Sequence, residues 1–147
     1  MTMSVEGYLK QYREADRKAR RLRQEYDKEK AEIDEIKSPL GTDGTPHGTG
    51  ISKSVENRAI RLADKLLEYE DARIEAIEIR QMLFDAIMQI GGIESDVLYD
   101  YYVDYFDKRR NKSRTWEDVA EMEHVSLSTV HRVKERAYKK LTLNDTF

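Results

Sequence analysis

Side chains that can hydrogen-bond to base edges or neutralise phosphates are concentrated near the C-terminal end of the chain. In DNA-binding surfaces, serine, histidine and arginine groups read base edges, and lysine and arginine charges hold the phosphate backbone. The candidates for base contact are Ser126, Leu127, Ser128, His131 and Arg132. The candidates for phosphate contact are Lys108, Arg109, Arg110, Lys112, Arg114, Thr129, Lys134, Arg136, Lys139 and Lys140. These residue types predict binding to double-stranded DNA.

The segment Thr115–Leu141 has the apolar spacing of two short helices joined by a tight turn. Each helix has one inward-facing stripe, so the two helices must cross, and the small side chain of Ala120 suits the crossing. Ser126 is placed to cap the second helix, which we expect to begin near Leu127. The apolar residues are Trp116, Val119, Ala120, Val125, Val130, Val133, Ala137 and Leu141. This layout predicts a helix-turn-helix, which places its second helix in the major groove of DNA.

An amphipathic helical hairpin that only packs against the rest of the chain would show the same apolar spacing. Charge favours DNA binding, because residues 108–141 contain ten basic and five acidic residues, a net charge of +5 in a chain of net charge -3. The turn contains Glu123-His124 where an apolar residue and glycine are usual, and a non-glycine residue at positive φ is strained. We expect either that Met122 supplies the missing apolar contact or that the turn has another shape.

These residues resemble region four of bacterial sigma factors and, more closely, the ArpU/RinA-type late-transcription regulators of phages that infect Gram-positive bacteria. The resemblance is carried by Leu98–Tyr102, Val119-Ala120 and the run Ser126–Lys134, and it covers roughly residues 95–141. It implies a helical N-terminal half followed by a sigma-like module, in a protein that activates late phage genes, including packaging genes. It also implies RNA polymerase as a candidate partner and the cytoplasm of the bacterial host as the location.

Composition predicts an all-α protein without a membrane segment. Charged residues make up 37% of the chain, and it has only two prolines and seven glycines, which favours long solvated helices. No apolar run is long enough to cross a bilayer, and the N-terminus has no signal-peptide pattern. The absence of cysteine excludes disulfides and thiolate metal sites. The three histidines lie in different elements and no serine has a nucleophile-elbow pattern, so we expect no catalytic site, cofactor or metal.

The N-terminal half has the apolar periodicity of two long helices. The first, predicted over residues 5–37, has a narrow seam, interrupted by Glu29, that cannot form a core alone. The second, predicted over residues 55–90, has a stripe wide enough to contact two neighbours. The seam consists of Tyr8, Tyr12, Ala15, Ala19, Leu22, Tyr26, Ile33 and Ile36. We therefore predict an antiparallel hairpin over residues 1–90, which forms a homo-oligomer, preferably a dimer, through the spare side of the stripe.

The connection between the two helices, Ser38–Ser54, contains both prolines and four of the seven glycines, which predicts a loop over residues 38–54. His47 and the run Gly48–Gly50 could suggest a metal or phosphate site. A lone histidine lacks partner ligands, and the glycine pattern lacks a preceding strand. We therefore predict a flexible linker.

A second break, Gly91-Gly92, separates the hairpin from a helix-turn-helix domain predicted over residues 95–141. It could be a hinge or an ordinary helix end. The aromatic residues that follow are predicted to form the core beneath the helix-turn-helix, although aromatics next to basic residues can also stack on unpaired bases. They are Tyr99, Tyr101, Tyr102, Tyr105 and Phe106.

Charge is also divided along the N-terminal half. Residues 55–107 contain thirteen acidic and five basic residues, and residues 10–23 contain seven basic and two acidic residues. The acidic stretch is expected to avoid DNA and to suit a basic partner. The basic stretch is expected to pair with the acidic helix, although it could also contact phosphates.

Together these features predict a phage-encoded, sequence-specific DNA-binding regulator of transcription, an activator of late genes. A small terminase subunit or another DNA-packaging factor combines the same kinds of element, but it would form a ring of many copies. A coiled-coil structural protein with a vestigial helix-turn-helix is the third interpretation, and it would not bind DNA even at low salt.

Overall fold

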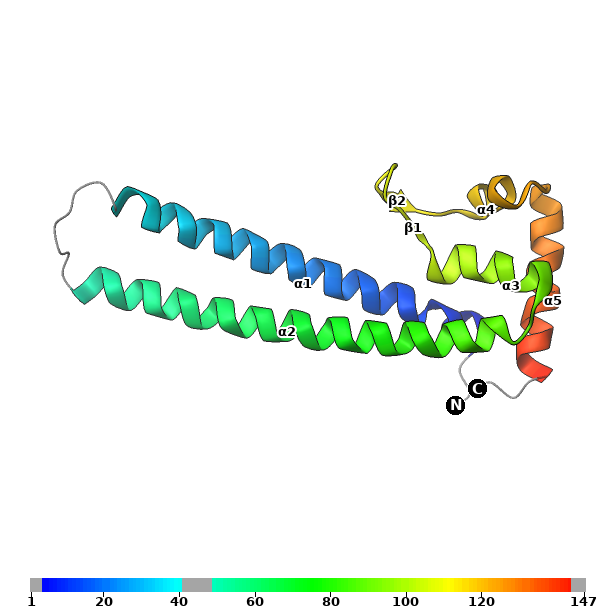
Figure 1. Ribbon diagram of the computed structural model, residues 1–147, viewed down its shortest axis with the longest axis horizontal. Helices are drawn as coiled ribbons and strands as arrows, with labels where there is room; N and C mark the ends of the chain where they lie inside the picture. Colours follow the sequence, from blue (N-terminus) through cyan, green and yellow to red (C-terminus); the bar gives the residue numbers. More distant parts are fainter. Residues whose placement is uncertain (1–3, 41–48, 144–147) are drawn as a thin grey trace. The chain divides into compact units, whose positions relative to one another are not determined.

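The computed structural model describes residues 4–40 and 49–143. It confirms an all-α fold in which two long helices precede shorter ones, with a single short β-hairpin among the described elements (Figure 1). In chain order the elements are α1 (Val5–Leu40), α2 (Thr49–Met88), α3 (Gly92–Leu98), the π-helix η1 (Tyr99–Val103), β1 (Phe106–Asp107), β2 (Lys112–Ser113), α4 (Trp116–Glu123) and α5 (Leu127–Leu143).

Both long helices extend into the predicted loop. α1 ends at Leu40 instead of Lys37, and α2 begins at Thr49 instead of Val55. Pro39 lies within the last turn of α1, although proline removes one backbone donor and crowds the carbonyl four residues earlier, so the predicted helix end after Lys37 is wrong. The segment between the helices is therefore shorter than predicted, and His47 lies outside the described residues.

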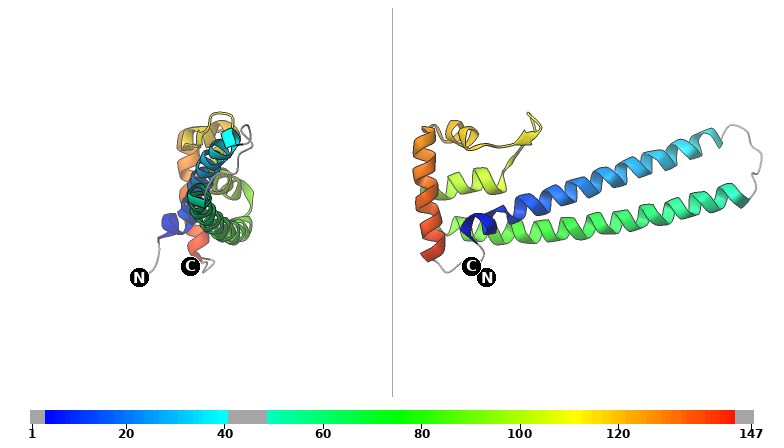
Figure 2. Two further views of the ribbon diagram at one scale, coloured as in Figure 1. Left: turned by 90° about the vertical axis from the view of Figure 1, so that its left-hand side faces the viewer. Right: turned by 180° about the vertical axis from the view of Figure 1, so that it is seen from behind.

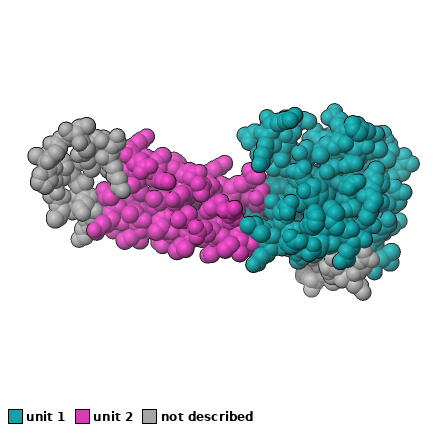
Figure 3. Space-filling model, in the orientation of Figure 1, with its two compact units in different colours: residues 1–15, 76–147 teal, residues 16–75 magenta. Residues whose placement is uncertain are grey.

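The chain divides into two compact units, coloured separately in Figure 3. Unit 1 comprises Met1–Ala15 and Ala76–Phe147, and unit 2 comprises Asp16–Glu75. This division differs from the predicted domains 1–90 and 95–141, because the first turns of α1 and the last turns of α2 share a core with the helix-turn-helix. The glycine break at residues 91–92, where φ is +73° and +66°, lies inside unit 1.

Unit 1 contains two clusters of buried side chains. The second cluster contains Val97 of α3 and four residues predicted as the inward stripes of the helix-turn-helix: Val119, Ala120, Val130 and Val133. The first cluster joins the end of α5 to the long helices. Figure 2 shows the ribbon of these helices from two further sides. The first cluster consists of Tyr8, Leu9, Leu83, Ala86, Ile87, Leu98, Tyr102, Val103, Ala137 and Leu141.

The aromatic residues after the glycine break form the predicted core. The main-chain N–H of Asp104 donates to the carbonyl of Tyr99 at 2.8 Å, the five-residue spacing of a π-helix. Tyr102 is fully buried, and its hydroxyl is hydrogen-bonded to the hydroxyl of Tyr138 on α5. Tyr101 stacks on Trp116 at a ring separation of 3.7 Å. These contacts hold α4 and α5 against the preceding segment.

Unit 2 consists of antiparallel stretches of α1 and α2 with little buried apolar surface. Its buried apolar residues among those described are Ala19, Ile33 and Ala72. Glu29, the residue that interrupts the predicted seam, forms an ion pair with Lys65 of α2 at 3.4 Å. The Arg23 guanidinium lies 5.3 Å from the ring centre of Tyr69 on α2.

The basic stretch of α1 forms ion pairs along its own helix. Arg20 pairs with Asp16 at 2.8 Å, and Arg23 pairs with Asp27 at 3.2 Å. Both pairs join residues one helical turn apart, a spacing that places side chains next to each other. Each of these two arginines therefore has an acidic partner within α1 itself. Over the described ranges, no helix is both long and apolar enough to cross a membrane.

Candidate nucleic-acid interface

The start of α4 is fixed by a capping box. The main-chain N–H of Asp118 donates to the Thr115 hydroxyl at 3.2 Å, and the main-chain N–H of Thr115 donates to the Asp118 carboxylate at 2.9 Å. This hydrogen bond from the Thr115 backbone is the main reason that the pKa of Asp118 lies below its usual value. The Arg110 guanidinium contacts the same carboxylate at 3.2 Å, so the cap also anchors the basic residues before α4.

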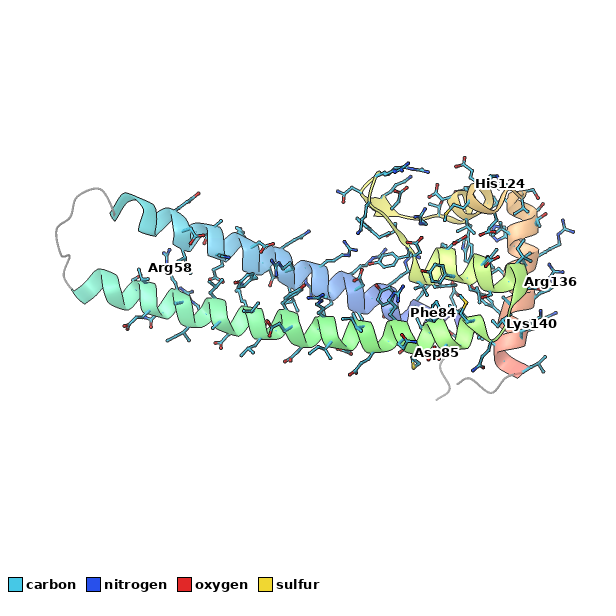
Figure 4. The ribbon with its side chains drawn as sticks, viewed as in Figure 1. Arg58, Phe84, Asp85, His124, Arg136 and Lys140 are labelled. Carbon is cyan, nitrogen blue, oxygen red and sulfur yellow. The ribbon has the colours of Figure 1, made fainter. Side chains whose placement is uncertain are left out.

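The turn between α4 and α5 is compact, and a histidine occupies its left-handed position. His124 has φ 57° and ψ 42°, and its N–H donates to the carbonyl of Glu121 at 3.2 Å (Figure 4). The main-chain N–H of Val125 donates to the carbonyl of Ala120 at 3.0 Å, and the Val125 side chain packs against the second cluster. Met122 is 37% exposed and its sulfur lies 3.1 Å from the Arg114 guanidinium, so the apolar contact that the structure shows for the turn is that of Val125.

Ser126 caps α5 as predicted. The main-chain N–H of Thr129 donates to the Ser126 hydroxyl at 3.2 Å, and α5 begins at Leu127. The Ser126 hydroxyl also lies 2.8 Å from the Thr129 hydroxyl and 3.1 Å from the Ser128 hydroxyl. These hydroxyl groups therefore satisfy one another and the end of the helix, which leaves the base-edge role mainly to residues further along α5.

The side of α5 that faces away from the core carries the predicted base-reading residues. Val130, Val133 and Ala137 are buried on the inner side, whereas Ser128, His131 and Arg132 are exposed. Within the described ranges, Arg132 forms no ion pair. The outer side forms a shallow hollow of about 580 Å³. The hollow is lined by Thr129, His131, Arg132, Glu135, Arg136 and Lys139.

Glu135 is a member of this hollow that was not predicted as a site residue. It lies one helical turn after His131, so the 3.6-residue period already places both on the same side of α5. A carboxylate can accept a hydrogen bond from the amino group of cytosine, but it repels phosphate. The hollow therefore combines cationic donors with one anionic acceptor, a composition that suits contact with base edges better than contact with phosphates alone.

The residues predicted to contact phosphates differ in whether their charges are exposed or already paired with acidic side chains. Lys108, Arg109 and Lys139 are exposed, and none of them pairs with an acidic side chain in the described part of the chain. Arg136 and Lys140 both contact Glu94 of α3, at 3.8 and 3.3 Å (Figure 4). A hydrogen bond from the backbone of Glu94 itself, followed by Lys140, holds the pKa of Glu94 below its usual value.

Two further predicted phosphate contacts are held inside unit 1. The Lys134 ammonium lies 5.2 Å from the ring centre of Trp116 and 5.9 Å from that of Tyr138, a cation–π arrangement. The Arg114 guanidinium donates to the carbonyl of Asp104 at 2.7 Å and contacts its carboxylate at 3.5 Å. Both side chains are mostly covered, so they position other elements and are poorly placed for phosphates.

The basic run before α4 forms a short β-hairpin. Phe106 is opposite Ser113 and Asp107 is opposite Lys112 in an antiparallel pair. The Asp107 carboxylate accepts hydrogen bonds from the main-chain N–H groups of Arg109 and Arg110 at 3.0 and 3.4 Å, which closes the turn. The hairpin exposes Lys108 and Arg109 at its end.

An acidic residue in the core beneath the turn was not predicted. Asp100 of the π-helix is buried, and its Oδ2 atom has no hydrogen-bond partner among the described residues. Burial, and then a hydrogen bond with Glu123 of α4, raise the pKa of Asp100 from 3.8 to about 8. The sequence offers only a weak signal, since Asp100 lies within an otherwise aromatic run.

Comparison with known proteins adds no assignment to this geometry. No protein-family model, curated protein or solved structure matches the chain.

Proposed function

We propose that this protein is a sequence-specific DNA-binding regulator of transcription that contacts duplex DNA with the outer side of α5. One observation supports it most strongly: His131 and Arg132 are exposed on a helix whose opposite side is fixed in the core of unit 1. A helix held in this way can enter the major groove without rearranging its support. The sigma-like resemblance further suggests a phage activator of late genes that works with the host RNA polymerase.

In the proposed complex, base edges and phosphates are contacted by different residues. Arg132 can donate two hydrogen bonds to guanine, while His131 contacts a neighbouring base edge. Lys108 and Arg109 of the hairpin and Lys139 of α5 supply charge without sequence preference. Arg136 and Lys140 would first have to leave Glu94, so we expect a smaller contribution from them.

The proposal is tested by selecting bound duplexes from a random DNA pool with the full chain, followed by binding titrations of Arg132→Ala. On the selected sequence, the substitution should weaken binding by about 1–3 kcal/mol and relax preference at one base pair. Lys139→Ala is the matched control in the same helix, and it should weaken binding to selected and random duplexes equally. Failure to enrich any sequence, or an equal loss for Arg132→Ala on both duplexes, would exclude sequence reading by α5.

A further inference from the structure

The outer side of α2 in unit 2 carries a line of exposed aliphatic residues. Ile60, Leu67 and Ile74 have exposed fractions of 61%, 58% and 55%. They are seven residues apart, so they lie on one side of the helix over roughly 21 Å. Single exposed aliphatic residues are common, but a regular line of them indicates a surface that another molecule covers.

The packing of unit 2 does not use this line. The neighbouring stretch of α1 contacts a different side of α2, where Ala72 is buried and Lys65 pairs with Glu29. Figure 4 shows Arg58 directed between the two helices, and both Arg58 and Arg61 line a small hollow with residues of α1. Three of the four basic residues between positions 56 and 75 are therefore directed toward α1.

The residues around the aliphatic line are acidic. At 100° per residue, the half of α2 centred on Leu67 contains five carboxylates between positions 56 and 75 and no lysine or arginine. All five are exposed. They are Glu56, Asp64, Glu70, Asp71 and Glu75. On this side of α2, the line of exposed aliphatic residues is therefore flanked only by acidic charges.

Charge decides between the two simplest partners for this surface. In a dimer formed through this surface, Asp64 and Asp71 of one copy would lie beside the same acidic residues of the other copy, whether the two helices run parallel or antiparallel. Like charges at an interface oppose association. A partner helix with lysine or arginine around its own apolar line would meet opposite charge along the whole surface. The surface that the sequence predicted as a dimer seam is thus better suited to a different protein.

We propose that the outer side of α2 between Glu56 and Glu75 is a docking surface for a basic amphipathic helix of a partner protein. The partner's apolar residues would cover Ile60, Leu67 and Ile74, and its basic residues would lie against Asp64 and Asp71. All of these residues belong to unit 2, so the proposal does not depend on DNA binding by α5.

The test uses two fluorescent synthetic helices and the full chain. The basic probe carries leucines seven residues apart, flanked by lysines, and the acidic probe has glutamate at the lysine positions. Fluorescence anisotropy should show binding of the basic probe, with affinity at least about tenfold higher than for the acidic probe. Leu67→Ser should weaken that binding by at least about tenfold, as expected at the centre of an interface. Leu143→Ser, which alters a leucine that is 81% exposed on α5, is its matched control.

Charge reversal separates a specific surface from general attraction to an acidic protein. Asp71→Lys and Glu25→Lys change the net charge equally, but Glu25 is an exposed residue of α1. Only Asp71→Lys should weaken binding of the basic probe, and circular dichroism should show equal helix content in every variant. The proposal is overturned if the basic probe does not bind, or if both reversals weaken it equally. It is also overturned if the chain sediments as a dimer that Leu67→Ser dissociates, because a second copy would then cover this surface.

Discussion

Unit 1 and unit 2 use helices in opposite ways. Unit 1 buries large side chains from α1, α2, α3, η1, α4 and α5 in two clusters, and so fixes the direction in which α5 presents its outer side. Unit 2 buries two alanines and one isoleucine among its described residues, while large aliphatic residues remain exposed on α2. The comparison indicates that unit 1 carries most of the stability, whereas unit 2 mainly presents surface.

The largest expected difference between the units is in how much free energy of unfolding is lost when a leucine is replaced by alanine. Leu9 of α1 is fully buried in the first cluster of unit 1. Leu9→Ala should lower the free energy of unfolding by about 2–5 kcal/mol, because it removes apolar contacts and leaves a cavity. Urea denaturation followed by fluorescence of Trp116, the only tryptophan, measures this loss.

Leu67→Ala in unit 2 is the matched control, since Leu67 is exposed. It should change the free energy of unfolding by no more than about 0.5 kcal/mol. Equal losses for the two leucines would mean that the units do not differ in this way, and that the exposed line on α2 contributes to folding.

A smaller change in the free energy of unfolding is expected with pH, because unit 1 contains the buried carboxyl group of Asp100. The pKa of Asp100 is about 8 in the folded chain, against 3.8 ordinarily, so the folded state retains a proton that the unfolded state has lost between these values. This contribution to stability is complete below about pH 4 and is lost as pH rises through about 8.

Asp100→Asn tests this sign because it keeps the shape of the side chain without its titration. Wild-type protein should lose up to about 4 kcal/mol more stability than the variant between pH 5 and pH 9, measured by urea denaturation at each pH. Parallel pH profiles for the two proteins would show that Asp100 is not protonated in the folded state.

The smallest expected effect concerns the turn between α4 and α5. His124 has a left-handed backbone conformation with φ 57°, which is strained for residues other than glycine. His124→Gly should raise the free energy of unfolding by up to about 1 kcal/mol, because relief of strain exceeds the greater flexibility of unfolded glycine. The denaturation midpoint should rise at constant slope, whereas a fall would show that the His124 side chain stabilises the turn.

Much of unit 1 follows from local sequence patterns. The spacing of Val119, Ala120, Val130 and Val133 gives two crossing helices, and Ser126 marks the start of α5 because capping depends only on nearby residues. Leu9 lies outside the predicted seam, because other members of its buried cluster, such as Leu83 and Leu98, are distant in sequence. The predicted domain boundaries differ from the compact units for the same reason.

The candidate interface was predicted less completely than the helices. Periodicity places His131 and Arg132 on the outer side of α5, but it does not show which lysines and arginines already contact other side chains of the protein. Lys134 is covered by Trp116 and Tyr138, and Arg136 pairs with Glu94 of α3. These contacts depend on how separate helices pack, and charge counting along one segment treats all of its cations as equal.

The proposal that the outer side of α5 binds duplex DNA is tested by fluorescence anisotropy of a labelled duplex with the full chain at 50 and 200 mM salt. With three to four phosphate contacts, affinity should fall by about 40- to 150-fold between these concentrations. Arg132→Glu should weaken binding at 50 mM salt by more than about tenfold, whereas Arg21→Glu, an equal charge change at an exposed residue of α1, should have little effect. No binding at 50 mM salt, or equal losses for the two variants, would contradict the proposal.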